Sequence, residues 1–226
     1  MKARLISYSQ SPTMNIGDLY VPEGIHELVA YCARVSNPSN QESTATTEKL
    51  LSYLAREKHW SPFEMVSACL EIETTRDIAR QILRHRSFSF QEFSQRYADP
   101  KDQGDMFEYS EARLQDPKNR QNSVAVENVE LHHQWIDAQE EVAALAKQKY
   151  DWAIKNGIAK EQARKVLPEG LTKSRMYVNG TLRSWIHFID LRSSNGTQKE
   201  HREIARACAE IISKIYPNIM EYSHDY

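Results

Sequence analysis

Residues 84–97, RHRSFSFQEFSQRY, carry the side chains that a site for a phosphorylated, planar ligand needs. Arginines bind phosphate through a planar fork of donors, aromatic rings stack on bases, and hydroxyl and amide groups hydrogen-bond to base edges. The same composition also fits a solvated basic helix end followed by a half-buried strand. To decide between a ligand site and a solvated helix end, other residue clusters in the sequence have to be considered.

A second cluster of arginine and histidine lies nearer the C-terminus. Arg183 and His187 are one turn apart on a predicted helix, and Arg192 falls at the end of that helix. A single cluster of this kind is usually solvated surface. Two clusters that both pair arginine with histidine favour a binding site.

Helical spacing also groups the side chains around the first cluster. Gln81 precedes Arg84 and His85 by three and four residues, so all three share one face of a predicted helix. If the chain becomes helical again beyond this point, Glu92 and Arg96 form an i, i+4 pair. Residues 59–64, HWSPFE, join a predicted helix to a predicted strand. This connection is either a loop that carries function or a simple turn, since Ser-Pro commonly starts a turn.

Metal ligands are sparse in this sequence. The spacings Glu23/His26 and Glu130/His133 resemble carboxylate-bridged metal sites of helical bundles, but no further partner glutamates are identifiable. We therefore expect no metal site.

The three cysteines are odd in number, far apart and without a CxxC pair. Cys32 and Cys208 fall on apolar helical stripes and Cys69 lies within a predicted strand, so we expect thiols of the core. Reduced thiols are typical of a cytoplasmic protein.

Composition excludes several classes of protein. The chain has 226 residues, 40% of them hydrophobic, and a formal net charge of -2, which disfavours a general nucleic-acid or membrane-surface binder. No stretch approaches the roughly eighteen apolar residues of a membrane span, and the N-terminal residues lack the apolar core of a signal peptide. Seven glycines form no GxG pattern, so Rossmann and P-loop phosphate turns are absent.

Hydrophobic periodicity predicts one α+β domain over residues 1–226, with a mixed or antiparallel sheet flanked by helices, one of them long. A polar stretch at 98–122 is expected to be a surface excursion. The predicted strands are residues 3–9, 64–73 and 172–179. The predicted helices are residues 24–34, 45–57, about 75–85, a helix of about thirty residues ending at Asn156, and two more that start near Leu182 and after Thr197.

Capping residues mark two of these helix starts. Thr74 or Thr75 is expected to cap the helix that runs to His85. Thr197 and Glu200 have the spacing of a capping box, which predicts the start of the last helix.

Four blocks of the sequence resemble motifs of the flavin-dependent thymidylate synthases, in the order of that family. Arg84-His85-Arg86, followed by seven residues and Ser94, is similar to the RHR motif of the family. The other blocks are HWSPFE at 59–64, ARKVLP at 163–168 and LRSWIHFIDLR at 182–192. By this resemblance the chain is identified as a member.

The resemblance implies synthesis of dTMP from dUMP, with methylenetetrahydrofolate as carbon donor and FAD, reduced by NADPH, as hydride donor. It also implies a homotetramer whose active sites are shared between subunits. The positions that match flavin contacts are His59, Ser61, Arg84, His85, Arg86, Glu92, Thr181, Leu182, Arg183 and His187. The positions that match dUMP contacts are Gln81, Arg84, Glu92, Ser94, Gln95, Arg96, Arg164 and Arg192.

Three positions depart from the pattern of the family. Met65 and Gln91 stand where relatives often have histidine and asparagine, and Thr181 replaces a frequent asparagine. These differences bear on single contacts rather than on the activity.

The chemistry of uracil agrees with the implied reaction. Its C5 atom is a poor nucleophile until negative charge enters the ring, and no cysteine here is a convincing nucleophile for C6. An arginine that stabilises the ring anion is the other route, because it stays protonated and presents a planar donor fork. We assign this catalytic role to Arg192, and we interpret Ser94 as a hydrogen-bond donor.

Two alternatives remain at this point. A single-stranded nucleic-acid-binding module would use the RHR run together with the aromatic residues that follow it. A helical metal oxidase would use the ExxH spacings. The net charge of -2 argues against the first, and the missing ligands argue against the second.

Overall fold

The computed structural model describes residues 2–12 and 20–224. Its main sheet has four strands in the order β1-β2-β6-β3, and every neighbouring pair is antiparallel. The strands are β1 Lys2–Tyr8, β2 Ser67–Thr75, β6 Lys173–Thr181 and β3 Phe88–Glu92. The predicted α+β class is confirmed, and the sheet is antiparallel rather than mixed.

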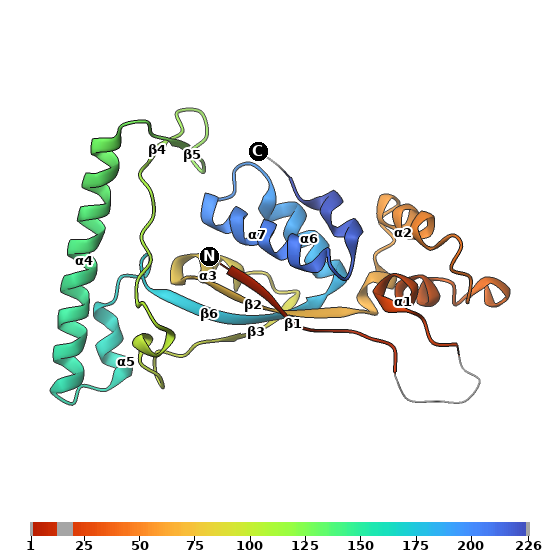
Figure 1. The fold of residues 1–226 in the computed structure, drawn as a ribbon, viewed down its shortest axis with the longest axis horizontal. Coiled ribbons are helices and arrows are strands. Elements are labelled where there is room, and N and C mark those ends of the chain that lie inside the picture. Colours follow the sequence, from red (N-terminus) through yellow and green to blue (C-terminus); the bar gives the residue numbers. More distant parts are fainter. Residues whose placement is uncertain (1, 13–19, 225–226) are drawn as a thin grey trace.

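Helices cover one face of this sheet and flank both of its ends (Figure 1). Helices α6 and α7 lie side by side over the sheet, α1 and α2 lie at one end, and α4 and α5 lie at the other. Their bounds are α1 Gly24–Ala33, α2 Thr47–Arg56, α3 Arg76–Ile82, α4 Val129–Lys155, α5 Lys160–Ala163, α6 Leu182–Ser193 and α7 Lys199–Ile212. The predicted long helix is confirmed as α4, which has 27 residues.

The main core lies between the sheet and the helices α6 and α7. Leu70 and Ile72 of β2 and Trp185 and Ile189 of α6 are all fully buried. Each such side chain stabilises the fold by about 1.5–3 kcal/mol. The indole N–H of Trp185 donates to the carbonyl of Ala68 at 3.0 Å, so α6 is held on β2 by a buried hydrogen bond as well.

A smaller apolar cluster lies between α4, α5 and the 98–122 excursion. It contains Met106, Tyr150, Ala153 and Ala163. The organisation as a single domain therefore stays a prediction, because the end of the molecule that holds α4 and α5 has apolar packing of its own. None of the described helices is both long and apolar enough to cross a bilayer.

The capping hydrogen bonds at the starts of α3 and α7 differ from the prediction. Thr75 is the N-cap of α3, but its hydroxyl bonds to Asp77 rather than to a helix N–H. The predicted capping box of α7 is wrong, since Gln198 is the N-cap and the Thr197 hydroxyl bonds to the carbonyl of Leu191. Glu200 instead pairs with Arg113. At α7, a partner distant in the sequence has thus replaced the local capping contact of Glu200.

The excursion at 98–122 is ordered and tied to its neighbours. Asp99 forms a capping box at the 3-10 helix Pro100–Gln103, and β4 Arg113–Gln115 pairs with β5 Ser123–Ala125. Ser110 accepts from and donates to the buried amide of Gln139 on α4. This segment thereby connects the long helix to the body of the protein.

Gly180 provides a test of the packing between β3 and β6. A Cβ atom at this position would lie 2.3 Å from the ring of Phe88, which packs against Trp185 and Phe188 and has no room to move. We expect Gly180→Ala to lower the free energy of unfolding by about 1–3 kcal/mol, because overpacking forces the strands apart.

Urea unfolding followed by circular dichroism measures this loss. Gly170→Ala is the matched control, because a Cβ there meets nothing within 4 Å. Equal stability of the two variants would contradict the packing described here.

Candidate active site

A hydrogen bond between Arg192 and His85 joins the two predicted clusters. Arg192 ends α6 and His85 follows α3, and the guanidinium Nε donates to the imidazole Nε2 at 2.9 Å. The imidazole is therefore uncharged, with its proton on Nδ1. Burial, and then repulsion from Arg192, lowers the pKa of His85 to about 4. The bond uses only Nε of Arg192, which leaves both Nη groups for a ligand.

Gln81 belongs to the same group of side chains. Its Oε1 lies 3.1 Å from Nδ1 of His201, and its Nε2 donates to Oε1 of Gln198 at 2.7 Å. The ring of His201 lies 6.3 Å from that of His85. Sequence reasoning missed His201, although it shares the apolar stripe of α7 with Ile204 and Cys208, and a histidine on such a stripe is a candidate polar group of the core.

Several cations here have no acidic partner. Within residues 2–12 and 20–224, no ion pair is formed by Arg84, Arg86, Arg164 or Arg192. Burial and the neighbouring charge of Arg84 lower the pKa of Arg192. Positive charge that is held without a counterion suits an anionic ligand such as a phosphate.

Glu92 is fixed by a different set of partners. It is the last residue of β3, where its carboxylate accepts from Ser174 at 2.8 Å and from Arg80 at 3.1 Å. Arg76 lies 3.7 Å away. The suggested helical pair of Glu92 with Arg96 is wrong, because β3 ends at Glu92 and the chain then forms a turn rather than a helix. Arg96 instead lies 3.7 Å from Glu161, next to α5. Glu92 therefore lies close to two arginines.

The segment after β3 places the remaining residues predicted to contact dUMP. The Ser94 hydroxyl is half-buried and accepts weakly from the backbone N–H of Arg96 at 3.4 Å. The side chain of Gln95 is only 3% exposed, so in this conformation its backbone alone can reach a ligand. Arg164 starts the 3-10 helix Arg164–Val166, next to α5.

The flavin-type positions gather at the start of α6. Thr181 caps this helix through its hydroxyl, and the Leu182 side chain is 2% exposed, so only its main chain is available. Arg183 pairs with Glu64 at 2.6 Å, and the His187 ring packs edge-on against Trp60 at 4.8 Å. Burial and Arg183 lower the pKa of His187.

His59 and Ser61 lie beside this group, before and within the 3-10 helix Ser61–Glu64, and both are exposed. The start of α6 lies near α1 and α2, whereas α5 lies at the opposite end of the sheet (Figure 1). One chain thus presents three groups of site residues: one around Arg192, one around Glu92 and Ser94, and one around Arg183.

The aromatic residues of 84–97 do not form an open stacking surface. Phe88 is 8% exposed and packs on Trp185, while Phe90 and Phe93 are half-buried. Tyr97 is 76% exposed. The alternative of a single-stranded nucleic-acid-binding module therefore loses the stack of rings on which it depended.

The cysteines lack the features of nucleophiles. Cys208 is fully buried, as predicted, whereas Cys32 and Cys69 are only partly buried. Burial raises the pKa of all three thiols. Among the described residues no group of three histidine, cysteine, aspartate or glutamate side chains has the arrangement of a metal site.

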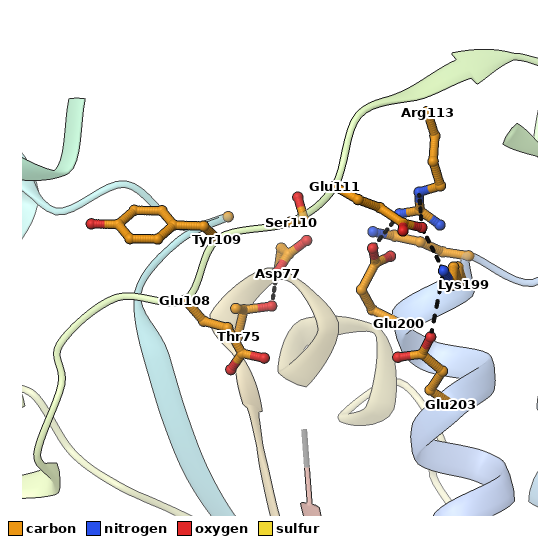
Figure 2. Close-up of a pocket in the computed structure, with 12 residues that line it drawn as sticks. Thr75, Asp77, Glu108, Tyr109, Ser110, Glu111, Arg113, Lys199, Glu200 and Glu203 are labelled. Carbon is orange, nitrogen blue, oxygen red and sulfur yellow. Dashed lines mark hydrogen bonds and ion pairs between the residues drawn. The ribbon is translucent and has the colours of Figure 1, made fainter. Parts of the chain in front are cut away.

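A polar cavity of about 270 Å³ lies between residues 108–113 and the start of α7 (Figure 2). Arg113 pairs with Glu200, and Lys199 pairs with Glu111 at 2.5 Å. Gln198, part of the hydrogen-bonded group described above, lines the same cavity. These ion pairs anchor the 98–122 excursion to α7.

The buried imidazoles predict how stability depends on pH. His85 and His201 have pKa values of about 4 and about 3 in the folded protein, against 6.5 when unfolded. The unfolded chain therefore binds these protons first, and stability falls as the pH drops below about 6.5. For His201 the expected loss is about 1.4 kcal/mol per pH unit.

Urea unfolding between pH 7 and 5 tests this expectation. His201→Asn should flatten the slope, whereas His133→Asn on the exposed face of α4 should not change it. An unchanged slope in His201→Asn would show that this imidazole is not held uncharged.

Comparison with known proteins shows which family the chain belongs to. Residues 20–218 match the family model described as thymidylate synthase complementing protein. The chain is 49% identical over 219 residues to the flavin-dependent thymidylate synthase of Synechocystis sp., covering 97% of each chain. It is 47% identical over 222 residues to a probable flavin-dependent thymidylate synthase of Paramecium bursaria Chlorella virus 1, again covering 97% of each.

A solved structure has the same fold. The UMP/dUMP methylase PolB from Streptomyces cacaoi, bound with 5-Br dUMP, superposes with a TM-score of 0.79 at 25% identity, covering 98% of this chain and 93% of that one. The chain therefore belongs to the flavin-dependent thymidylate synthase family, and it is an enzyme that converts dUMP to dTMP with methylenetetrahydrofolate and reduced FAD.

Proposed function

We propose that Arg192 is the catalytic residue of this reaction. The observation that carries the proposal is its hydrogen bond to the uncharged imidazole of His85, with no carboxylate partner among the described residues. Two free Nη groups can then bind the uracil carbonyl and N3 and stabilise negative charge in the ring. One preorganised donor of this kind is worth about 3 kcal/mol in the transition state.

The dUMP nucleotide would be held by side chains on both sides of α3. Arg84 lies close enough to Arg192 to lower its pKa, and Gln81 bonds to His201, whose ring lies near that of His85. Ser94, Arg96 and Arg164 supply donors near the end of β3. A phosphate suits Arg164 or Arg96, because a guanidinium binds it in a bidentate manner. Gln95 would contribute its backbone, because its side chain is buried.

Glu92 would act mainly by position. Its carboxylate is already bonded to Ser174 and Arg80, so it orders the end of β3 from which the dUMP-binding segment continues. Ser94 would be a hydrogen-bond donor, since no described hydrogen bond joins its hydroxyl to a general base.

The residues present fit FAD. Arg84 and Arg86 are exposed cations without acidic partners among the described residues, which suits a diphosphate. His59, Ser61, Thr181, Arg183 and His187 provide donors and acceptors around the start of α6, and His85 and Leu182 would contribute main-chain contacts. FAD supplies the hydride after reduction, for which we propose NADPH, and methylenetetrahydrofolate supplies the carbon.

No thiol is needed in this scheme. Cys208 is buried and the pKa of each cysteine is raised, so none is poised to add to C6 of the pyrimidine. Electrostatic stabilisation by Arg192 replaces covalent activation. Three reduced cysteines are also consistent with the proposed cytoplasmic location.

We further propose a homotetramer with shared active sites. Three groups of site residues on one chain, spread along its sheet, favour completion of each site by a neighbouring subunit. Helix α4 also carries an exposed apolar stripe beside its buried face. This stripe consists of Trp135, Val142, Leu145 and Trp152, which are 45%, 52%, 57% and 59% exposed. Apolar surface of this kind marks a subunit interface.

Arg192→Lys tests the catalytic assignment. Lysine keeps the charge but lacks the planar fork, so we expect flavin to stay bound and dTMP formation to fall by a factor on the order of 100. Absorbance of bound flavin and single-turnover formation of dTMP are the two measurements.

Arg175→Lys is the matched control, since Arg175 pairs with Glu73 on the sheet and has no assigned role. Near-normal turnover in Arg192→Lys would remove Arg192 from the proposed role.

Leu145→Asp tests the proposed assembly. A buried carboxylate without a partner at the interface is strongly unfavourable, so we expect dissociation to smaller species together with loss of bound flavin. Sedimentation velocity measures the mass. Glu140→Arg, on another face of α4, should leave the assembly unchanged, and an intact tetramer in Leu145→Asp would show that the stripe is not an interface.

A further inference from the structure

His201 is a fully buried histidine that no step of the proposed reaction uses. It lies on α7, is 0% exposed, and packs against the ring of Phe188 with centroids 5.7 Å apart. Its Nδ1 is 3.1 Å from Oε1 of Gln81. A buried polar side chain aimed at a candidate substrate contact has a direct route to influence that contact.

The hydrogen bonds define which atom of His201 carries the proton. Gln81 already donates from Nε2 to Gln198 at 2.7 Å, so its Oε1 is the acceptor that faces the imidazole. His201 must therefore donate from Nδ1, which leaves Nε2 unprotonated. That Nε2 atom is buried and has no hydrogen-bond partner among the described residues.

The surroundings keep this imidazole uncharged. Burial first, and then the positive charge of Arg192 and the imidazole of His85, lower the pKa of His201 to about 3. The imidazole is consequently uncharged across the pH range in which enzymes normally work, and its hydrogen bond to Gln81 selects the tautomer. A constant donor at Nδ1 gives Gln81 a constant acceptor partner.

We infer that His201 is a positioning residue that sets the orientation of the Gln81 amide toward the substrate. With Oε1 held by His201 and one N–H of Nε2 held by Gln198, the second N–H of Nε2 is the group left for a ligand. Gln81 then offers a donor, which suits an oxygen acceptor of dUMP and opposes a donor. This inference rests on the proposed function, in which Gln81 contacts dUMP.

The reversed amide shows what the histidine prevents. If Gln81 turned over, its Nε2 would face the Nδ1–H of His201 and its oxygen would face the oxygen of Gln198. Both pairings place like groups together, and the one at the fully buried His201 is the more unfavourable because water cannot satisfy the polar groups there. Without His201 the amide loses this bias, and an oxygen can face the oxygen acceptor of the nucleotide.

Direct measurement of dUMP affinity on the FAD-loaded enzyme tests the inference. His201→Leu removes the donor and should raise the Kd for dUMP by roughly 10-fold, as expected for one hydrogen bond lost. His201→Asn should restore most of the affinity, because its amide N–H lies close to the position of Nδ1. His201→Gln should not, because its amide lies nearer the position of Nε2. Isothermal titration gives each Kd, and flavin absorbance verifies that each variant is folded.

A double-mutant cycle with Gln81→Leu separates positioning from general damage. If His201 acts through Gln81, the double variant His201→Leu/Gln81→Leu binds dUMP no more weakly than Gln81→Leu alone. His26→Leu is the control histidine, because His26 packs on Tyr216 outside this hydrogen-bonded group, and its Kd should equal that of the wild type.

The outcomes distinguish this inference from the proposed function. Additive losses in the cycle, or an equal loss in His201→Asn and His201→Leu, overturn the role of His201 while the dUMP contact of Gln81 stands. An unchanged Kd in Gln81→Leu overturns that contact and the inference with it. Should His201→Leu not fold, the comparison of His201→Asn with His201→Gln still decides, since equal affinity in these two variants also overturns the role.

Discussion

The structure depends on an arginine that is held in place by an uncharged partner. Arg192 is oriented by the imidazole of His85 at 2.9 Å, where most buried or half-buried arginines would have a carboxylate. A carboxylate would fix the guanidinium equally well, but it would neutralise the charge on which the proposed catalytic role of Arg192 depends. An uncharged acceptor such as His85 orients Arg192 without neutralising its positive charge. That charge can then act on a ligand at the proposed site.

The scaffold explains how this arrangement is maintained. Arg192 and His85 come from α6 and from the turn after α3, and α6 is fixed to the sheet by the buried Trp185 and its hydrogen bond to Ala68. Phe88 then follows His85 into the same core, so the turn has little freedom. Rigid packing is required here, since a displacement of about 1 Å in a catalytic group is enough to weaken catalysis substantially.

The sequence alone predicts the elements better than the polar contacts between them. Strands β2 and β6, helices α1, α2 and α6 and the long α4 follow from periodicity, because burial on one face leaves a regular pattern. The capping box of Thr197 failed, because Glu200 pairs with Arg113, far away along the chain. The buried side chain of Gln95 and the role of His201 were likewise invisible, because each depends on a distant segment that local spacing does not reveal.

Uncompensated charge also links stability to function. Burial, and then the charge of Arg84, lower the pKa of Arg192, so the fold holds two cations close together. At the proposed site a phosphorylated nucleotide would reduce this repulsion as it binds. Binding of the anion would therefore also stabilise the fold.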